Sequence, residues 1–244
     1  GSDGKTYHFF IQYVISHVTR SDERMSQFFV ILNDIMRQFK ETRKRDLVLE
    51  VPVVVPVNNR LRLLSTNASS LSLEDIYEVS SRAEGHDPDD PLLLHRSIVK
   101  DLDPVTLTRE MKIKIFDQIK TEMVPDNLLS KYMSKRITSP DQLFAFKKVF
   151  TTQISLTGYL CYLLNIGERH LNKIRVSLNS GRITHSDFFL QYNSKSAVDF
   201  HDPVPFRLTP NLTAFMTPFM VDGLFITAMH SMNLAIYKYQ EVIK

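Results

Sequence analysis

The chain has 244 residues, of which 43% are hydrophobic, enough to bury one large core or two smaller ones. Its formal charge of +3 is small for this length and does not indicate a nucleic-acid-binding domain, where basic residues would dominate one face. The single cysteine, Cys161, excludes a disulfide framework and a multi-cysteine zinc site, and favours the cytosol or the nucleus. The first residues also lack the basic-then-apolar order of a secretory signal.

The N-terminal quarter of the chain predicts a small sheet with one helix. A glycine turn at residues 1–4 precedes a strand from Thr6 to Gln12 that is rich in aromatic and β-branched side chains. Apolar residues then recur every three or four positions from Ser21 to Lys40, which indicates one amphipathic helix of about five turns. The valine-rich segment from Leu47 to Leu64 contains two prolines and predicts a pair of strands with irregular edges.

The remainder of the chain is predicted to be mainly helical. Residues 69–75 open a helix, with Ser70 or Ser72 as its N-cap and acidic side chains in its first turn. An aspartate-rich polar segment at 84–91 predicts a loop. The nearly uncharged stretch from Val149 to Ile166 approaches the length of a membrane span. Its several threonine, serine and glutamine side chains favour a helix buried inside the protein instead, so we expect no membrane segment.

A basic run from Arg37 to Arg45 is the densest charge in the sequence. Cations at the end of a helix interact favourably with the negative end of its dipole, so we interpret this run as a solvated helix end. A contact with phosphate or with an acidic partner is the alternative.

Three short motifs near the C-terminus carry the strongest functional signal. Gly167-Glu168-Arg169-His170-Leu171-Asn172-Lys173 is followed by His185-Ser186-Asp187-Phe188-Phe189 and then by Val204-Pro205-Phe206-Arg207-Leu208-Thr209. In order and spacing they resemble the catalytic core of the phosphatidylinositol 3-kinase-related kinases. Active members of that family read Gly-Asp-Arg-His-x-x-Asn, His-x-Asp-Phe-Gly and Val-Pro-Phe-Arg-Leu-Thr. Residues 69–77 and 204–211 are similar to the TRRAP-type pseudokinase branch of the family.

The resemblance implies an α+β fold of the two-lobed, protein-kinase-like type. Residues 1–65 would form the N-lobe, a small antiparallel sheet with one long helix. Residues 66–244 would form a mostly helical C-lobe. The chain would then be a fragment of a much larger protein, without the short terminal helical segment, called FATC, that ends members of the family.

The same resemblance implies that the groups needed for phosphoryl transfer are degenerate. Gln12 stands where a lysine holds the nucleotide phosphates, and Glu168 replaces the aspartate that orients the acceptor hydroxyl. Lys173 replaces a magnesium-binding asparagine. Asp187 keeps the metal-binding carboxylate, but Phe189 replaces the glycine that follows it. We therefore expect no catalytic residue, no cofactor and no bound metal.

Lys173 is the strongest single objection to activity. Two like unit charges 4 Å apart repel by roughly 4 kcal/mol at an effective dielectric constant of about 20, and a divalent ion is repelled more. Our hypothesis is that the Lys173 ammonium pairs with Asp187 in place of magnesium.

Adenine binding is also expected to be impaired. The family usually places a tryptophan at the hinge between the lobes, whereas this chain has no tryptophan and carries Ser65-Thr66-Asn67 there. Three histidines near the motifs, His170, His185 and His201, match no compact zinc pattern. We expect His170 and His185 to hold the remnant loop by hydrogen bonds.

By analogy with the TRRAP-type branch, the predicted function is that of a non-catalytic pseudokinase domain in a nuclear scaffold subunit. Expected partners are other subunits of SAGA/NuA-type histone acetyltransferase complexes, transcription activators and the helical repeats of the parent chain, with no direct nucleic-acid site. The alternative is an active Ser/Thr protein kinase of the same family, with Glu168 as the base. A third possibility is a protein-binding module unrelated to kinases.

Overall fold

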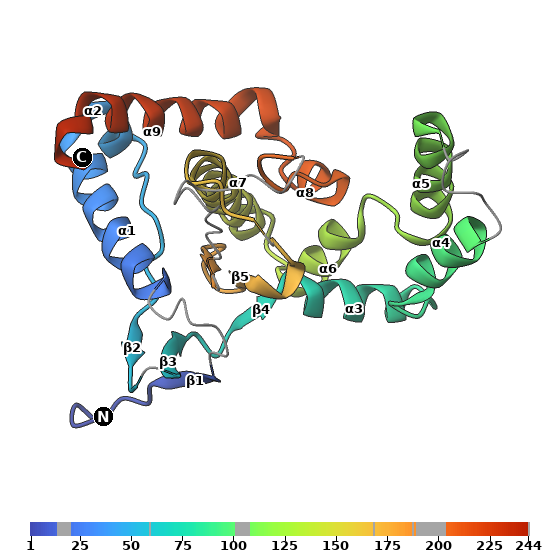
Figure 1. The fold of residues 1–244 in the computed structure, drawn as a ribbon, viewed down its shortest axis with the longest axis horizontal. Helices are drawn as coiled ribbons and strands as arrows, with labels where there is room; N and C mark the ends of the chain where they lie inside the picture. Colours follow the sequence, from blue (N-terminus) through green and yellow to red (C-terminus); the bar gives the residue numbers. More distant parts are fainter. Residues whose placement is uncertain are drawn as a thin grey trace, which may run out of the picture.

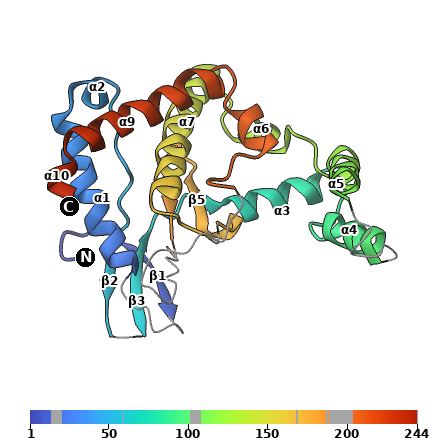
Figure 2. The same cartoon turned by 45° about the horizontal axis from the view of Figure 1, so that its top comes forward.

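The computed structural model describes residues 1–13, 21–58, 60–100, 108–167, 169–186, 188 and 204–243. The described residues form two small antiparallel sheets, and helices surround the second sheet (Figure 1). The first sheet and helix α1 lie at one end of the molecule, and helices α4 and α5 lie at the other (Figures 1 and 2).

The first sheet has the strand order β1-β3-β2 and is formed by β1 (His8–Tyr13), β2 (Val54–Pro56) and β3 (Leu61–Thr66). All its pairings are antiparallel, and Gln12 lies opposite Arg62. The strand predicted at Thr6–Gln12 and the strand pair predicted within 47–64 are therefore confirmed, with their bounds shifted by a few residues. A turn closed by a bond from the Gly4 N–H to the Gly1 carbonyl precedes β1, as expected.

The predicted long helix is α1 (Ser21–Gln38), and it ends two residues earlier than expected. Phe39 adopts an extended conformation and separates α1 from a short helix, α2 (Lys40–Lys44). This break allows the Thr42 hydroxyl to reach the carbonyls of Met36 and Phe39. The basic run forms the ends of these two helices, where Arg37 and Arg45 make exposed ion pairs with nearby carboxylates.

The second sheet was not predicted. It has the order β4-β5-β6 and consists of β4 (Ser70–Ser72), β5 (Ile174–Ser177) and β6 (Ile183–His185). Strands of three or four residues give too short an alternation to be recognised in the sequence. Helix α3 (Leu73–Ala83) follows β4, and Ser72 and Asp75 form its capping box, which decides between the two serines considered as N-cap.

The remaining elements are mainly helical, as expected. Helix α7 crosses the centre of the molecule, with α9 packed against it and α1 against α9 (Figure 1). The sequence from 84 to 89 forms turns before α4. These elements are α4 (Asp90–Lys100), α5 (Arg109–Met123), α6 (Leu128–Arg136), α7 (Pro140–Leu163), the 3-10 turn η1 (Leu171–Lys173), α8 (Pro210–Phe215), the π-helical turn η2 (Met220–Phe225), α9 (Ile226–Lys238) and α10 (Gln240–Ile243).

Two apolar cores hold the fold together. One joins α1 to α7 and α9, with Leu32 and Met36 of α1 packed among Leu156, Leu160 and Met232. The other fills the space between α3, α6, α7, α8 and the second sheet. Helix α7 contributes to both cores, which explains why its stretch of apolar residues is so long. Within the described ranges no helix has the length and apolarity that a bilayer crossing needs.

Candidate functional site

The residues predicted to form the site meet at a cleft between the two sheets. The cleft has a volume of about 560 Å³, within the usual range for ligand pockets. Strand β1, the end of β3, η1 and strands β5 and β6 supply its walls. Its described lining residues include no aspartate or glutamate; they are Phe10, Ile11, Gln12, Tyr13, Pro52, Leu64, Ser65, Thr66, Asn172, Lys173, Arg175, Thr184, His185 and Ser186.

Gln12 lies in the cleft wall, and its side chain is engaged by a neighbouring arginine. The cross-strand pair Gln12–Arg62 shares one face of the first sheet. Arg62 is only 5% exposed, and its Nε donates to the Gln12 Oε1 at 2.9 Å. The amide is neutral, and its carbonyl oxygen already accepts a charged hydrogen bond. It is therefore a weaker partner for phosphate than the lysine of active family members would be.

Lys173 ends the η1 turn and also lines the cleft. The N–H of Ser186 donates to the Lys173 carbonyl at 3.1 Å, which ties η1 to the end of β6. An ammonium group offers only donors, whereas magnesium requires oxygen ligands, so this position does not suit a metal. Glu168, Asp187 and Phe189 lie outside the described residues, so the predicted pairing of Lys173 with Asp187 stays a prediction.

The histidines have different positions. His185 is buried on β6, and its ring lies 4.9 Å from the ring of Phe188. His170 is exposed and precedes η1, where its carbonyl accepts the Lys173 N–H at 3.1 Å. His201 lies outside the described residues. In the part of the chain that the structure covers, no three His, Cys, Asp or Glu side chains gather to hold a metal.

Arg169 joins two of the sequence motifs. Its guanidinium donates to the carbonyls of Ile166, Val204 and Pro205 at 3.1, 2.5 and 2.7 Å. Arg207, in the third motif, makes a bond in the opposite direction: its Nε donates to the Arg169 carbonyl at 3.0 Å. The two arginines therefore fasten the loop that begins at Gly167 to the segment that begins at Val204.

The expected hinge residues lie where the two sheets meet. Ser65 and Thr66 end β3 and line the cleft. Asn67 follows in a turn in which its side-chain oxygen accepts the N–H and the hydroxyl of Ser69. The chain then enters β4 at Ser70. This wall of the cleft offers small polar side chains and no large aromatic ring.

Comparison with known proteins identifies the family. The family described as phosphatidylinositol 3- and 4-kinase matches residues 9–244. The chain belongs to this family. Among solved structures, the FAT and kinase domain of CtTel1 superposes on this chain with a TM-score of 0.81 at 18% sequence identity. The match covers all of this chain and 17% of the CtTel1 chain. The expected two-lobed α+β kinase-like fold is therefore confirmed.

Relatives of this chain include a protein named for transcription, a subunit of acetyltransferase complexes and a protein kinase subunit. The mouse Transformation/transcription domain-associated protein is 28% identical over 233 residues, 94% of this chain and 9% of its own length. The Saccharomyces cerevisiae SAGA complex/NuA4 acetyltransferase complex subunit TRA1 is 26% identical over 258 residues, 97% of this chain and 7% of its own length. The mouse DNA-dependent protein kinase catalytic subunit is 28% identical over 246 residues, which are 94% of this chain and 6% of that protein. The expected likeness to the TRRAP-type branch is confirmed, and the chain spans less than a tenth of these relatives.

Sequence reasoning missed two residues that shape this kinase-like site. Arg62 could have been found, because strand alternation places it on the same face as Leu64, and pairing with β1 brings Gln12 opposite. The role of Arg169 had no such signal. Two of its three acceptors are backbone carbonyls 35 and 36 residues further along the chain, and a carbonyl is present at every position of a sequence.

Proposed function

We propose that this chain is a non-catalytic, kinase-like domain of a scaffold subunit in SAGA/NuA4-type histone acetyltransferase complexes. The similarity to a yeast protein named as a subunit of both complexes supports the complex assignment. The similarity to the Transformation/transcription domain-associated proteins supports a role in transcription, and hence in the nucleus. Residues 1–65 and 66–244 would be its two lobes.

The observation that carries the non-catalytic assignment is the side-chain chemistry of the cleft. Gln12 stands where phosphate needs a cation, and its carbonyl is bound by the buried Arg62. Lys173 lines the cleft where a metal ligand is needed. The Gln12 side chain is therefore neutral where active members carry a cation, and the Lys173 side chain carries a positive charge that opposes metal binding.

The shared core is consistent with an architectural role. Helix α1 belongs to the N-terminal half of the fold, yet its apolar face packs into the same core as α7 and α9. Polar contacts strengthen this connection, because Gln153 of α7 donates to the Val48 carbonyl at 2.7 Å and Arg182 pairs with Glu50 at 2.9 Å. The two proposed lobes would thus be joined away from the cleft as well as at the proposed hinge.

The partners follow from the scaffold role. We propose contacts with other acetyltransferase-complex subunits, with the helical remainder of the parent protein and with transcription activators that recruit the complex. In the parent protein, the substitution Asp187→Ala should leave assembly of the complex and histone acetylation unchanged. A loss of histone acetylation with an intact complex would contradict the non-catalytic assignment.

Nucleotide binding is the direct test. A ligand at a hundred times its dissociation constant stabilises the folded state by about 2.7 kcal/mol. For a chain of this size, that raises the thermal midpoint by roughly 5 to 11 °C. We expect no shift at millimolar ATP with magnesium. The double variant Gln12→Lys, Lys173→Asn restores the residues of active members and should shift more than the natural chain.

The alternative, an active Ser/Thr protein kinase, is favoured by the similarity to the DNA-dependent protein kinase catalytic subunit. A magnesium-dependent shift in the natural chain, followed by transfer of radiolabelled phosphate to a serine peptide, would establish this alternative and refute our proposal.

A further inference from the structure

The short helix α2 carries cations that the fold does not neutralise. Lys40, Arg43 and Lys44 lie three and four residues apart, so their side chains share one face of the helix. All three are exposed, and within the described part of the chain none of them pairs with a carboxylate. Like charges at this spacing repel one another, so this face of α2 favours a bound anion.

The two nearest ion pairs leave that charge in place. Arg45 holds the Glu41 carboxylate at 2.8 Å, and Arg37 holds the Asp34 carboxylate at 2.9 Å. Each of these carboxylates therefore already has a cation of its own. The basic run thus divides into arginines that are paired within the fold and three cations that are not.

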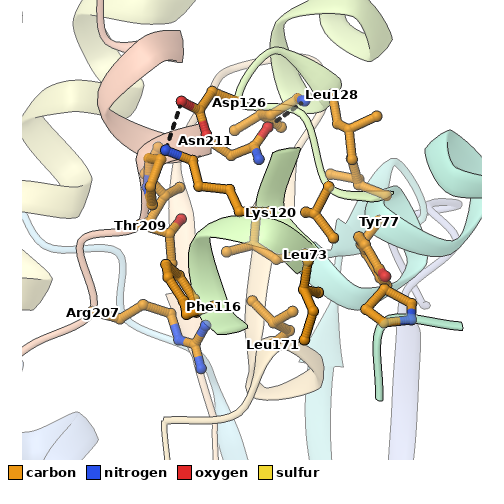
Figure 3. Close-up of a pocket in the computed structure, with 17 residues that line it drawn as sticks. Leu73, Tyr77, Phe116, Lys120, Asp126, Leu128, Leu171, Arg207, Thr209 and Asn211 are labelled. Atoms are coloured by element: carbon orange, nitrogen blue, oxygen red, sulfur yellow. Dashed lines mark hydrogen bonds and ion pairs between the residues drawn. The ribbon is translucent and has the colours of Figure 1, made fainter. Parts of the chain in front are cut away.

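The pocket next to α5 shows the opposite arrangement. It has a volume of about 360 Å³ and is formed by α3, α5, the start of α6 and residues 207–212. Its Lys120 is paired with the Oδ2 of Asp126 at 3.1 Å (Figure 3). The charge of that lysine is neutralised inside the pocket lining, so the cations of α2 are the better candidates for an external anion.

The backbone under these cations is held firmly. Thr42 is fully buried on the opposite side of α2, where its hydroxyl donates to the carbonyls of Met36 and Phe39 at 2.5 and 3.0 Å. The N–H of the buried Leu47 donates to the Thr42 carbonyl at 3.0 Å. A turn that is fixed in this way presents its cations in one arrangement, which lowers the entropy lost on binding.

A fourth cation lies beside the start of α2. The end of α9 packs against α2 (Figure 1), and the Nζ of Lys238 lies 5.6 Å from the centre of the Phe39 ring. Lys238 is exposed and makes no ion pair with a described carboxylate. Two separate helices therefore contribute positive charge to the same small surface.

The kind and spacing of these cations favour phosphate over carboxylate. The guanidinium of Arg43 can hold two oxygens of one anion at once, and Lys40 and Lys44 add two ammonium groups within the same helical turn. A phosphate group on a side chain offers three acceptor oxygens and a charge of about −1.5 to −2, whereas a carboxylate offers two oxygens and one charge. The phosphate can therefore use all three cations.

The surroundings favour one compact anion over a long one. Asp46 follows α2, Asp34 lies one turn before the end of α1, and Glu241 lies on α10. A nucleic acid carries a continuous array of phosphates, some of which would be brought towards these carboxylates. A single phosphorylated side chain avoids most of that repulsion.

We propose that the face of α2 formed by Lys40, Arg43 and Lys44, with Lys238 beside it, binds a phosphorylated serine or threonine of a partner protein. Arg43 would hold two of the phosphate oxygens, and the lysines would contact the third. Charge complementarity of this kind gives specificity for the phosphorylated form of the partner. The inference goes beyond the proposed scaffold role and does not depend on the state of the cleft.

The test is fluorescence anisotropy with labelled pools of short peptides. The first pool has phosphoserine at its centre and random neutral residues around it. One matched pool has serine at the centre, and another has glutamate. The phosphoserine pool should bind at least about tenfold more tightly than both, because only its central residue can use all three cations. Inorganic phosphate should compete with this pool.

Four variants of the chain locate the binding. Arg43→Ala should weaken the phosphoserine pool about five- to tenfold, and Arg43→Lys should restore only part of the affinity, because an ammonium group cannot hold two oxygens side by side. The matched controls are Arg82→Ala, an exposed arginine in the last turn of α3, and Lys148→Ala, an exposed lysine of α7. Both should bind as the natural chain does. All four positions are exposed, so the thermal midpoint should change little.

Three results would overturn the proposal. Equal binding of the phosphoserine and glutamate pools would show that the face accepts any acidic side chain. Tighter binding of a labelled DNA duplex, also weakened by Arg43→Ala, would assign the face to nucleic acid. Unchanged binding of phosphoserine by Arg43→Ala would place the phosphate elsewhere. An ATP-induced thermal shift that persists in Arg43→Ala would concern the cleft alone, so this proposal and the non-catalytic assignment can fail separately.

Discussion

The core shared by α1, α7 and α9 predicts that the two halves of the molecule unfold together. Leu32 of α1 is fully buried in this core, and replacing a buried leucine with alanine costs about 3 to 5 kcal/mol, more where a cavity stays open. For a chain of this length, each kcal/mol lowers the thermal midpoint by about 2 to 4 °C. We therefore expect Leu32→Ala to lower the midpoint by roughly 6 to 20 °C.

The natural chain has no tryptophan, so the fluorescence of a single introduced tryptophan reports on unfolding at its own position. A single tryptophan at Phe9 reports on the first sheet, and one at Phe144 reports on α7. In the Leu32→Ala background both probes should report the same lowered midpoint. Val30→Ala, at a half-exposed position of the same helix, should change stability by less than about 0.5 kcal/mol. Separate midpoints for the two probes would refute the reasoning, because they would show two independent cores.

Two further predictions concern hydrogen-bonded groups. Arg169→Ala removes three hydrogen bonds to backbone carbonyls and should lower the free energy of unfolding by about 2 to 4 kcal/mol, measured by urea unfolding. Arg169→Lys should have an intermediate effect. A decrease below about 0.5 kcal/mol would show that the two motifs stay joined without this arginine. Burial alone would raise the pKa of Asp75, but the bonds from the Ser72 hydroxyl and N–H, together with nearby Arg175, lower it below its usual 3.8. The ionised carboxylate therefore stabilises the fold above the unfolded-state pKa, and this contribution disappears as pH falls through the folded-state pKa. Asp75→Asn should flatten the acid limb of a stability-against-pH curve, whereas an unchanged acid limb would contradict this assignment.

The sequence determined the first sheet and the helices with strong periodicity. The stripe through Met25, Phe29, Leu32 and Met36 is the buried face of α1, because a regular apolar repeat permits only one face to be buried. Its end was less predictable. Phe39 continues the repeat, but the chain turns extended there so that the Thr42 hydroxyl can bond to the Met36 carbonyl. A local side-chain hydrogen bond thus accompanies the end of the helix before the apolar repeat ends.

The motifs indicated which residues belong to the candidate site, but they did not predict the contacts that these residues make. The resemblance named Gln12 and Lys173 as site residues, and both line one cleft in the structure although they are far apart in the sequence. The bond from Arg62 to Gln12 depends on strand register, which spacing alone does not give. The pocket next to α5 was not predicted, because it is formed by α3, α5, the start of α6 and residues 207–212, which periodicity and motifs do not place side by side.

The bonds made by Arg169 bear on how a kinase signature should be interpreted in any sequence. This arginine holds the main chain of a neighbouring segment, and that task remains whether or not a phosphate is ever transferred. A sequence motif can therefore stay recognisable after catalytic activity is lost, because some of its residues have a structural role. Only the positions that contact nucleotide or metal indicate activity. A comparison that gives every motif position the same weight will assign enzymatic activity to too many proteins.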